Sequence, residues 1–251
     1  FHYFIIIVKM PVKTHIKRII SKDMKSIKEH ELEKNGIFII FNEQDVTEAY
    51  AMIIGPKDSC YEGGLLYFKI NFPTQYPHIP PKVQYISRGS IRIHPNLYRG
   101  RRQEDYLGKV CLSLLGTWSG PGWTSIMDIT SILLTIQSLL TNDPLTKEPG
   151  YTNSTGEINE RYNTCVELET LRTLIIKNSL EIPYGLEEFK PHIINHFKDI
   201  NSLEFKFSQK IDNNNIEKGE CIISYPKKIF CEYDDIYNKI LVSNGKSLII
   251  N

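Results

Sequence analysis

Cys111 is the residue in this sequence best suited to covalent chemistry. It lies in the segment Gly108–Ser113, and Asn96 precedes it by 15 positions. A thiolate attacks a carbonyl carbon, and a carboxamide N–H can stabilise the oxyanion that develops. We therefore predict acyl transfer through a thioester on Cys111. The simpler alternative for Asn96 is that it closes or holds the loop after Pro95 through backbone hydrogen bonds.

His94 and Pro95 come directly before Asn96. A cysteine with a histidine base and an orienting asparagine is the arrangement of a thiol hydrolase. His94 and Asn96 are only two positions apart with a proline between them, so they are poorly placed to stack as base and orienter. The spacing disfavours a hydrolase and predicts that His94 and Pro95 are structural parts of the active site.

The elements that must hold these residues are indicated by hydrophobic patterning. Residues 12–33 carry apolar side chains at three- and four-residue steps, which predicts a helix. Four strand signals follow, with connections short enough for an antiparallel meander. These strand signals lie at 37–41, 48–54, 64–72 and 82–86. Residues 95–123 show no period, which predicts a long loop around Cys111.

Three helices are expected after this loop, at 128–140, 156–177 and 186–200. In the second of them, the apolar residues are expected to face inward, namely Ile158, Tyr162, Cys165, Val166, Leu168, Leu171 and Leu174.

The remaining sequence is only weakly patterned. We expect a segment at 1–11, a core domain at 12–178 and a C-terminal extension at 179–251.

Bulk composition is that of a globular protein. The chain has 251 residues, of which 41% are hydrophobic and 24% are charged. Its net charge of +1 argues against a nucleic-acid surface. The apolar start, Phe1–Val8, is too short to span a membrane. We interpret it as a buried strand or an end foreign to the native protein, with a truncated signal sequence as the alternative.

The chain has five cysteines and no CxxC pair. Neither a metal site nor a disulfide framework is therefore predicted, and a reducing compartment fits this usage. Cys60, Cys165, Cys221 and Cys231 are expected to be buried, inert thiols.

Several motifs in order resemble the ubiquitin-conjugating enzyme family over about residues 12–178. They are Phe72–Pro77 with Pro80–Val83, His94–Asn96, Gly108–Leu112, Trp123 and the apolar helix that ends at Leu140. Two further segments, Leu112–Trp118 and Glu148–Tyr151, are most similar to the larger Z-type members, which carry a C-terminal extension. The resemblance implies the α+β UBC fold: an N-terminal helix, a four-stranded antiparallel meander sheet, a long active-site loop and C-terminal helices.

The same resemblance implies a ubiquitin-conjugating enzyme. Cys111 would accept ubiquitin or a ubiquitin-like modifier from an activating enzyme and pass it to a substrate lysine or to a ligase. Asn96 and Glu148 would be catalytic, with Glu148 orienting the incoming lysine. Asp143 competes with Glu148 for this role, and a solvated loop carboxylate is the alternative. His94 would bond to backbone, and the chain would need no cofactor because the activating enzyme consumes the ATP.

Partner surfaces are implied in the same way. Lys13, Lys17 and Arg18 would contact the activating enzyme, with an ordinary solvated helix face as the alternative. His78 and Trp123 would belong to a ligase-binding surface, although many members have a large apolar residue where this chain has His78. Substrate proteins are further partners, nucleic acid and membrane are not, and the cytoplasm, the nucleus or both are expected.

One departure from the family and one other function stay open. The gap between Asn96 and Cys111 is several residues longer than usual, and the surplus Arg99–Leu107 is rich in charge. This insert predicts a gate or a substrate contact beside the active site. A catalytically inactive variant that binds ubiquitin as an adaptor is the alternative function, against which the presence of Cys111 and Asn96 argues.

Overall fold

The computed structural model describes residues 13–100, 106–198, 202–210, 216–224, 228–234, 239–243 and 246–250. The expected segment 1–11 and positions 101–105 of the charged insert lie outside these residues. The chain divides into two compact units, Phe1–Phe189 and Lys190–Asn251, which we describe separately.

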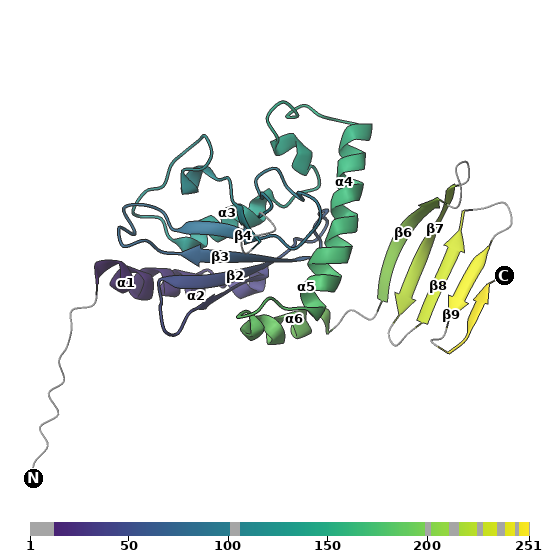
Figure 1. The fold of residues 1–251 in the computed structure, drawn as a ribbon, viewed down its shortest axis with the longest axis horizontal. Coiled ribbons are helices and arrows are strands. Elements are labelled where there is room, and N and C mark those ends of the chain that lie inside the picture. Colours follow the sequence, from purple (N-terminus) through teal and green to yellow (C-terminus); the bar gives the residue numbers. More distant parts are fainter. Residues whose placement is uncertain are drawn as a thin grey trace, which may run out of the picture. The chain divides into compact units, whose positions relative to one another are not determined.

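The first unit is built on an antiparallel sheet whose strands follow chain order (Figure 1). The strands are β1 (Ile37–Phe41), β2 (Glu48–Ile54), β3 (Leu65–Asn71), β4 (Lys82–Ile86) and β5 (Leu107–Lys109). The predicted meander is confirmed, but the sheet has five strands where four were expected. β5 pairs with β4 through Gln84↔Lys109 and Ile86↔Leu107. A three-residue strand centred on Gly108 is too short to show an alternating pattern.

The N-terminal helix packs beside this sheet. α1 (Thr14–Arg18) continues through a π-helical turn, Ile19–Asp23, into α2 (Met24–Glu29). The helix ends before the expected residue 33, because Glu31 adopts a left-handed conformation with φ 46°.

The core lies between one face of the sheet and α3 (Ile129–Leu139). Asp128 begins α3 by accepting a hydrogen bond from the Ser131 N–H at 3.1 Å. Its apolar face is buried against inward-facing strand residues. These fully buried side chains include Ala51, Ile53, Leu66, Phe68, Ile132, Leu133 and Ile136. The predicted amphipathic pattern of residues 128–140 is confirmed.

Residues beyond the expected boundary at 178 also belong to the first unit. Tyr67, on the opposite face of β3, donates a hydrogen bond to the Asn178 carbonyl at 3.1 Å. Its ring stacks on that of Phe189, with centroids 6.1 Å apart. Arg88 forms an ion pair with Glu181 at 3.2 Å. The first unit therefore reaches Phe189.

α4 (Glu157–Glu169) continues through a π-helical segment, Thr170–Lys177, into α5 (Asn178–Leu180). The expected helix is present, and its inward face was predicted correctly only in part. Val166 and Leu174 are buried in the core as expected. Ile158, Cys165 and Leu168 are exposed. The buried face also includes polar residues, among them Glu169 and Thr170, whose side chains bond to backbone of the first unit. An apolar pattern alone does not reveal such a face.

The second unit opens with α6 (Lys190–Phe197) and continues as a sheet that the weak patterning did not predict. Its antiparallel strands are β6 (Ser202–Lys210), β7 (Ile216–Ser224), β8 (Lys228–Tyr233), β9 (Ile240–Ser243) and β10 (Leu248–Ile250). Cys221 and Cys231 are opposite each other on β7 and β8 and form a disulfide. The expectation of two free thiols at these positions is therefore wrong, because pairing across neighbouring strands is not visible in the spacing.

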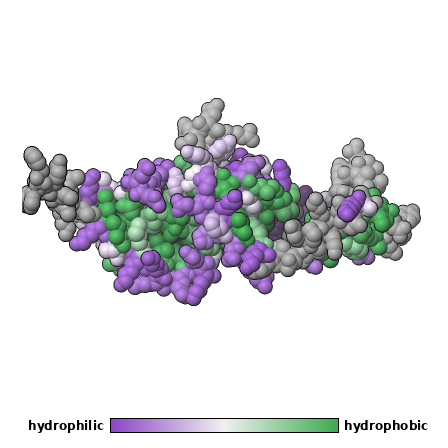
Figure 2. All heavy atoms as spheres, turned by 90° about the horizontal axis from the view of Figure 1, so that it is seen from below, coloured by the Kyte–Doolittle hydropathy of each residue, from purple (hydrophilic) through white to green (hydrophobic). Residues whose placement is uncertain are grey.

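Apolar surface remains exposed on the first unit, including Ile20, Ile79 and Ile126. Figure 2 shows one face of the molecule, where hydrophobic and hydrophilic surface lie side by side. Such exposed apolar residues can serve as contacts for other proteins. Among the described residues, no helix has the length and apolar character needed to cross a bilayer.

Candidate active site

Two short antiparallel segments, 96–98 and 109–111, place Asn96 opposite Cys111. The Cys111 N–H donates to the Asn96 carbonyl at 2.8 Å, and the Tyr98 N–H donates to the Lys109 carbonyl at 2.9 Å. We call these two segments and their connection the active-site hairpin. The described ends of the charged insert, 99–100 and 106–107, lie beyond the paired segments, so the insert does not separate Asn96 from Cys111.

Gly108 permits the two arms to approach. A Cβ at this position would lie only 1.6 Å from the Tyr98 carbonyl oxygen. No side chain fits there without moving the backbone. The glycine before Lys109 in the sequence motif therefore has a steric cause.

The Asn96 side chain completes the pairing with Cys111. Its Nδ2 donates to the Cys111 carbonyl at 2.7 Å, and it is 6% exposed. The backbone N–H of Asn96 is not available for this bond, because it donates to His94 Nδ1 at 2.9 Å. The carboxamide thus replaces a backbone donor in the ladder. Two roles were expected for Asn96, and this contact supports one of them, that of holding the loop.

His94 is fully buried, and both of its ring nitrogens have partners. Nδ1 accepts from Asn96, and Nε2 lies 3.1 Å from the Leu139 carbonyl, to which it donates in the neutral ring. Burial lowers the pKa of His94 to about 4. A histidine held in this way has no free nitrogen with which to take a proton from Cys111.

The buried neutral state of His94 predicts a pH-dependent stability. The pKa is about 4 in the folded protein and 6.5 ordinarily. The unfolded chain therefore binds more protons between these values, and the free energy of unfolding falls as pH drops. We expect a loss of ~2 kcal/mol between pH 7.5 and pH 5. Urea unfolding at both pH values measures it.

The His94→Gln variant is the control for this prediction and should lack most of the loss. An equal loss in both proteins would assign the effect to other groups. The comparison stops at pH 5 because burial raises the pKa of Asp23, which acts in the opposite direction at lower pH.

Thr117 fixes the backbone on both sides of Cys111, a role that the sequence did not indicate. Its hydroxyl donates to the Val110 carbonyl at 2.7 Å and accepts from the Leu112 N–H at 2.9 Å. With the two bonds to Asn96, four backbone groups of residues 110–112 are held by hydrogen bonds: the Val110 carbonyl, both polar groups of Cys111 and the Leu112 N–H. Cys111 itself is 2% exposed, and its sulfur has no hydrogen-bond partner among the described residues.

Arg92 connects Glu148 to the His94–Asn96 segment. Its guanidinium lies 3.2 Å from the Glu148 carboxylate, donates to the Pro95 carbonyl, and stacks over the Tyr98 ring at 3.9 Å. Glu148 is therefore paired beside the active-site hairpin. Asp143, the competing position, is exposed and has no such connection among the described residues. Arg92 was missed because an isolated arginine carries no motif.

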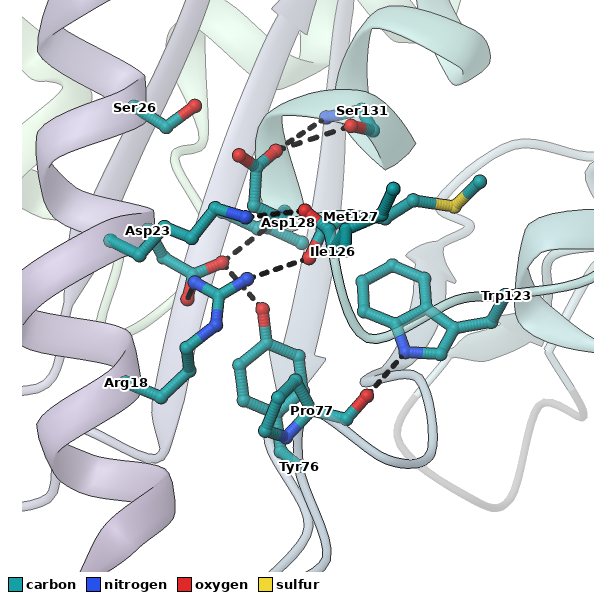
Figure 3. A network of polar contacts seen from close by, with 12 residues as sticks. Arg18, Asp23, Ser26, Tyr76, Pro77, Trp123, Ile126, Met127, Asp128 and Ser131 are labelled. Carbon is teal, nitrogen blue, oxygen red and sulfur yellow. Dashed lines mark hydrogen bonds and ion pairs between the residues drawn. The ribbon is translucent and has the colours of Figure 1, made fainter.

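A second polar network joins the N-terminal helix to the loop before α3 (Figure 3). The fully buried Asp23 accepts from Tyr76 at 2.6 Å and from the Ile129 N–H at 2.9 Å, and pairs with Arg18 at 3.1 Å. Arg18 also donates to the Met127 carbonyl at 2.7 Å. Arg18, one of the predicted partner residues, therefore has partners for its charge inside the protein.

The Tyr76 hydroxyl is expected to stabilise this network measurably. Tyr76→Phe removes one donor from a buried carboxylate, so the free energy of unfolding should fall by ~2 kcal/mol in a urea titration. Tyr50→Phe is the matched control, since its hydroxyl bonds a partly exposed Glu48 at 3.2 Å. Similar losses in both variants would contradict a special role for the buried network.

The other predicted partner residues lie at the surface or partly buried. Lys13, Lys17 and His78 are exposed. Trp123 is half-buried, and its indole N–H donates to the Pro77 carbonyl at 2.7 Å (Figure 3). This bond ties Trp123 to the proline-rich segment, which gives it a structural contact in addition to the predicted one.

Cys60 is a second buried free cysteine, and its surroundings disfavour reactivity. Cys60 is buried as expected, and its sulfur lies 3.3 Å from the Asn142 carbonyl. Burial raises the pKa of the Cys60 thiol to about 11, which disfavours the thiolate. Within the described residues, no group of three or more His, Cys, Asp or Glu side chains is arranged to hold a metal ion.

Comparison with known proteins identifies the family. Residues 19–168 match the family model for ubiquitin-conjugating enzyme, and this chain belongs to that family. It is 39% identical to ubiquitin-conjugating enzyme E2 Z of Danio rerio over 160 residues, which are 62% of this chain and 46% of that protein. The same identity and share of this chain hold for the Homo sapiens E2 Z, of which 42% is covered.

A more distant relative, the probable ubiquitin-conjugating enzyme protein 17 of Caenorhabditis elegans, is 35% identical over 208 residues. That match covers 78% of this chain and 27% of the relative. The chain therefore spans about half the length, or less, of these relatives. The predicted family and the Z-type resemblance are confirmed.

Proposed function

We propose that this protein is a ubiquitin-conjugating enzyme that carries ubiquitin, or a ubiquitin-like modifier, as a thioester on Cys111. The Cys111 thiolate attacks the carbonyl of the modifier's thioester on the activating enzyme, and the activating enzyme's thiolate leaves. A substrate amine or a ligase cysteine then attacks the new thioester and releases Cys111. The single observation that carries this proposal is the pairing of Asn96 with Cys111 on the active-site hairpin.

The surroundings of Cys111 favour a carrier over a hydrolase. Hydrolysis needs a base that activates water, and both nitrogens of His94 are occupied. The low exposure of Cys111 further limits the access of water. A thioester in such a site hydrolyses slowly, so it reacts mainly with an amine or a thiol that binds next to it.

Asn96 is proposed to have two roles at the same time: it holds the hairpin, and it stabilises the oxyanion. A carboxamide has two N–H donors, and one of them bonds the Cys111 carbonyl. The second is left for the oxygen that becomes negative when the thioester is attacked. Both functions follow from one side-chain orientation.

Glu148 is proposed to orient the incoming lysine. Its carboxylate is one-third exposed, at 32%, so a substrate amine can reach it. Arg92 limits its motion by binding Glu148 and Pro95 with one planar guanidinium. Arg92 acts through Glu148 and is therefore a positioning residue.

Lys13 and Lys17 are proposed to contact the activating enzyme, and His78 and Trp123 to lie at a ligase surface. Arg18 is left out of this proposal because it pairs with Asp23. The chain requires no cofactor of its own in this scheme, because the activating enzyme uses the ATP. We place the protein in the cytoplasm, the nucleus or both.

A charging assay tests the function. The full chain is incubated with an activating enzyme, ATP and labelled ubiquitin, and the products are separated without reductant. We expect an ATP-dependent adduct that a reducing agent removes. Binding of ubiquitin without an adduct would instead indicate an adaptor, and ATP-independent cleavage of ubiquitin esters would indicate a hydrolase. Ubiquitin-like modifiers with their own activating enzymes are tested in parallel.

The positioning role of Arg92 gives a separate prediction. Arg92→Lys keeps the charge but loses the planar guanidinium, whose Nη2 contacts both Glu148 and Pro95 and whose plane stacks on Tyr98. We expect normal charging and about 10-fold slower discharge to free lysine, since a charge-assisted hydrogen bond contributes roughly 1.5–3 kcal/mol. Rates of discharge from pre-charged protein measure this.

The conservative variant Arg161→Lys is the control, because Arg161 forms only an exposed pair with Glu157. Glu148→Gln combined with Arg92→Lys should be no slower than the slower single variant if the two residues act as a unit. Additive effects would show that Arg92 does not act through Glu148.

A further inference from the structure

A cationic pocket lies at the end of the active-site hairpin, away from Cys111. Its volume is ≈ 320 Å³. Three parts of the first unit line it: the turn after β4, the described ends of the charged insert, and the end of α4 with its continuation. Its lining includes Ser87, Arg88, Arg99, Glu169, Arg172 and Lys177.

Among the described residues, three of the lining cations have no acidic partner. Within the described part of the chain, Arg99 and Arg172 form no ion pair, and the buried Nε of Arg99 has no hydrogen-bond partner. Lys177 donates only to the Arg88 carbonyl, at 3.3 Å. Arg88 itself is paired with Glu181. Like charges held close together without compensation raise the energy of the empty pocket and favour an anionic occupant.

The carboxylate among the described lining residues, that of Glu169, does not offset these cations. Glu169 is 4% exposed and already accepts three hydrogen bonds. The Ser90 N–H and hydroxyl donate to it at 2.9 and 3.1 Å, and the Thr173 hydroxyl at 2.7 Å. Its oxygens are directed at these groups, so the guanidinium groups of Arg99 and Arg172 are left for another anion.

We infer that this pocket binds a phosphoryl group. Two guanidinium groups, one ammonium and the Ser87 hydroxyl, which has no partner among the described residues, bring donors from separate segments of the chain to one pocket. A phosphoryl group has three acceptor oxygens and a charge near −2, whereas a carboxylate has two oxygens and one charge. The number of donors and charges therefore favours phosphate chemistry.

The pocket is linked to the candidate active site through the active-site hairpin. This link is geometric and does not require the proposed function. Arg99 is three residues beyond Asn96 along one arm of the hairpin, which corresponds to about 10 Å at ~3.4 Å per residue. An anion held there would bind the base of the charged insert. The source of the phosphoryl group, a free anion or a phosphorylated side chain of another protein, is what the experiment separates.

The test measures binding by isothermal titration calorimetry with the uncharged full chain. The probes are inorganic phosphate, inorganic pyrophosphate, a phosphoserine peptide and the same peptide with glutamate in place of phosphoserine. We expect phosphoryl binding that weakens at least 10-fold in Arg172→Gln and in Arg99→Gln. Arg161→Gln removes the same charge from α4 outside the pocket and should change affinity less than 2-fold.

Arg172 is exposed, so its variant should fold even if Arg99→Gln does not. If the phosphoserine peptide binds more tightly than the inorganic anions, the site is supported and the phosphoryl group comes from a phosphorylated protein. If the inorganic anions bind more tightly, the site is supported and its ligand is a free anion. No binding of any phosphoryl probe, equal binding of the glutamate peptide, or equal weakening by Arg161→Gln would overturn the proposal. Because no thioester is needed, failure here leaves the charging assay unaffected.

Discussion

Cys111→Ala is expected to abolish modifier charging, and Cys111→Ser to replace the reducible adduct with an ester that resists reductant. Loss of the nucleophile costs on the order of 10⁶-fold in a well-studied acyl-transfer enzyme. The serine oxygen can still attack the activated carbonyl, but the oxygen ester it forms is far less reactive toward amines. Transfer to lysine should therefore stop in both variants, although only alanine prevents the adduct. Non-reducing and reducing gels, with hydroxide treatment of the adduct, distinguish these outcomes.

Both variants should keep the fold. The Cys111 sulfur makes no hydrogen bond among the described residues, and the backbone around it is tied by Asn96 and Thr117. Removing the sulfur from a site that is 2% exposed leaves a small cavity, with an expected loss of ~1 kcal/mol in stability.

Two other cysteines provide matched controls. Cys165→Ser changes an exposed thiol and Cys60→Ala changes a buried one. Both should charge at the wild-type rate. If a reducible adduct persists in Cys111→Ala and disappears in Cys165→Ser, the carrier is Cys165, and the proposal for Cys111 is contradicted.

The sequence predicted the first unit well where its elements are long and their apolar faces are regular. The four longer strands of the sheet and the helix at 128–140 produce strong periodic signals, because each buries one face against the core. Short pairings, such as β5 with β4, produce no such signal. Their position follows from backbone hydrogen bonds, which any residue type can make.

The second unit shows a different limit. Its strands carry exposed apolar residues, including Ile222, Phe230 and Val242, next to charged ones such as Glu220. A sheet with this mixed surface does not produce clean alternation in sequence. The disulfide between Cys221 and Cys231 depends on the register of β7 and β8, which composition alone cannot supply.

At the candidate site, the residue types were predictable and their contacts were not. Cys111, Asn96 and His94 stand in recognisable motifs, but the bond from Asn96 Nδ2 to the Cys111 carbonyl depends on the hairpin. Arg92 and Thr117 lie outside the residues that the motifs assign to chemistry. Their importance comes from what they touch, since each binds backbone next to a motif residue.

The Asn96→Ala variant is expected to charge normally but to discharge to lysine 10²–10³-fold more slowly. Loss of a single oxyanion donor has this effect in other acyl-transfer sites. Charging is less sensitive, provided that the activating enzyme supplies part of the oxyanion environment for the first transfer. Single-turnover discharge of pre-charged protein into free lysine isolates the second step.

Slower discharge in Asn96→Ala has two possible causes, the loss of the oxyanion donor and a disturbed loop, and a control separates them. Asn96→Ala also leaves the buried Cys111 carbonyl without its side-chain donor, which should cost roughly 1–3 kcal/mol of stability. Thr117→Val is the matched control, because it removes bonds on both sides of Cys111 and leaves the Asn96 carboxamide in place. If Asn96→Ala slows discharge at least 10-fold more than Thr117→Val at a similar loss of stability, the carboxamide acts on the oxyanion. If the two variants discharge at equal rates, Asn96 serves only to hold the hairpin.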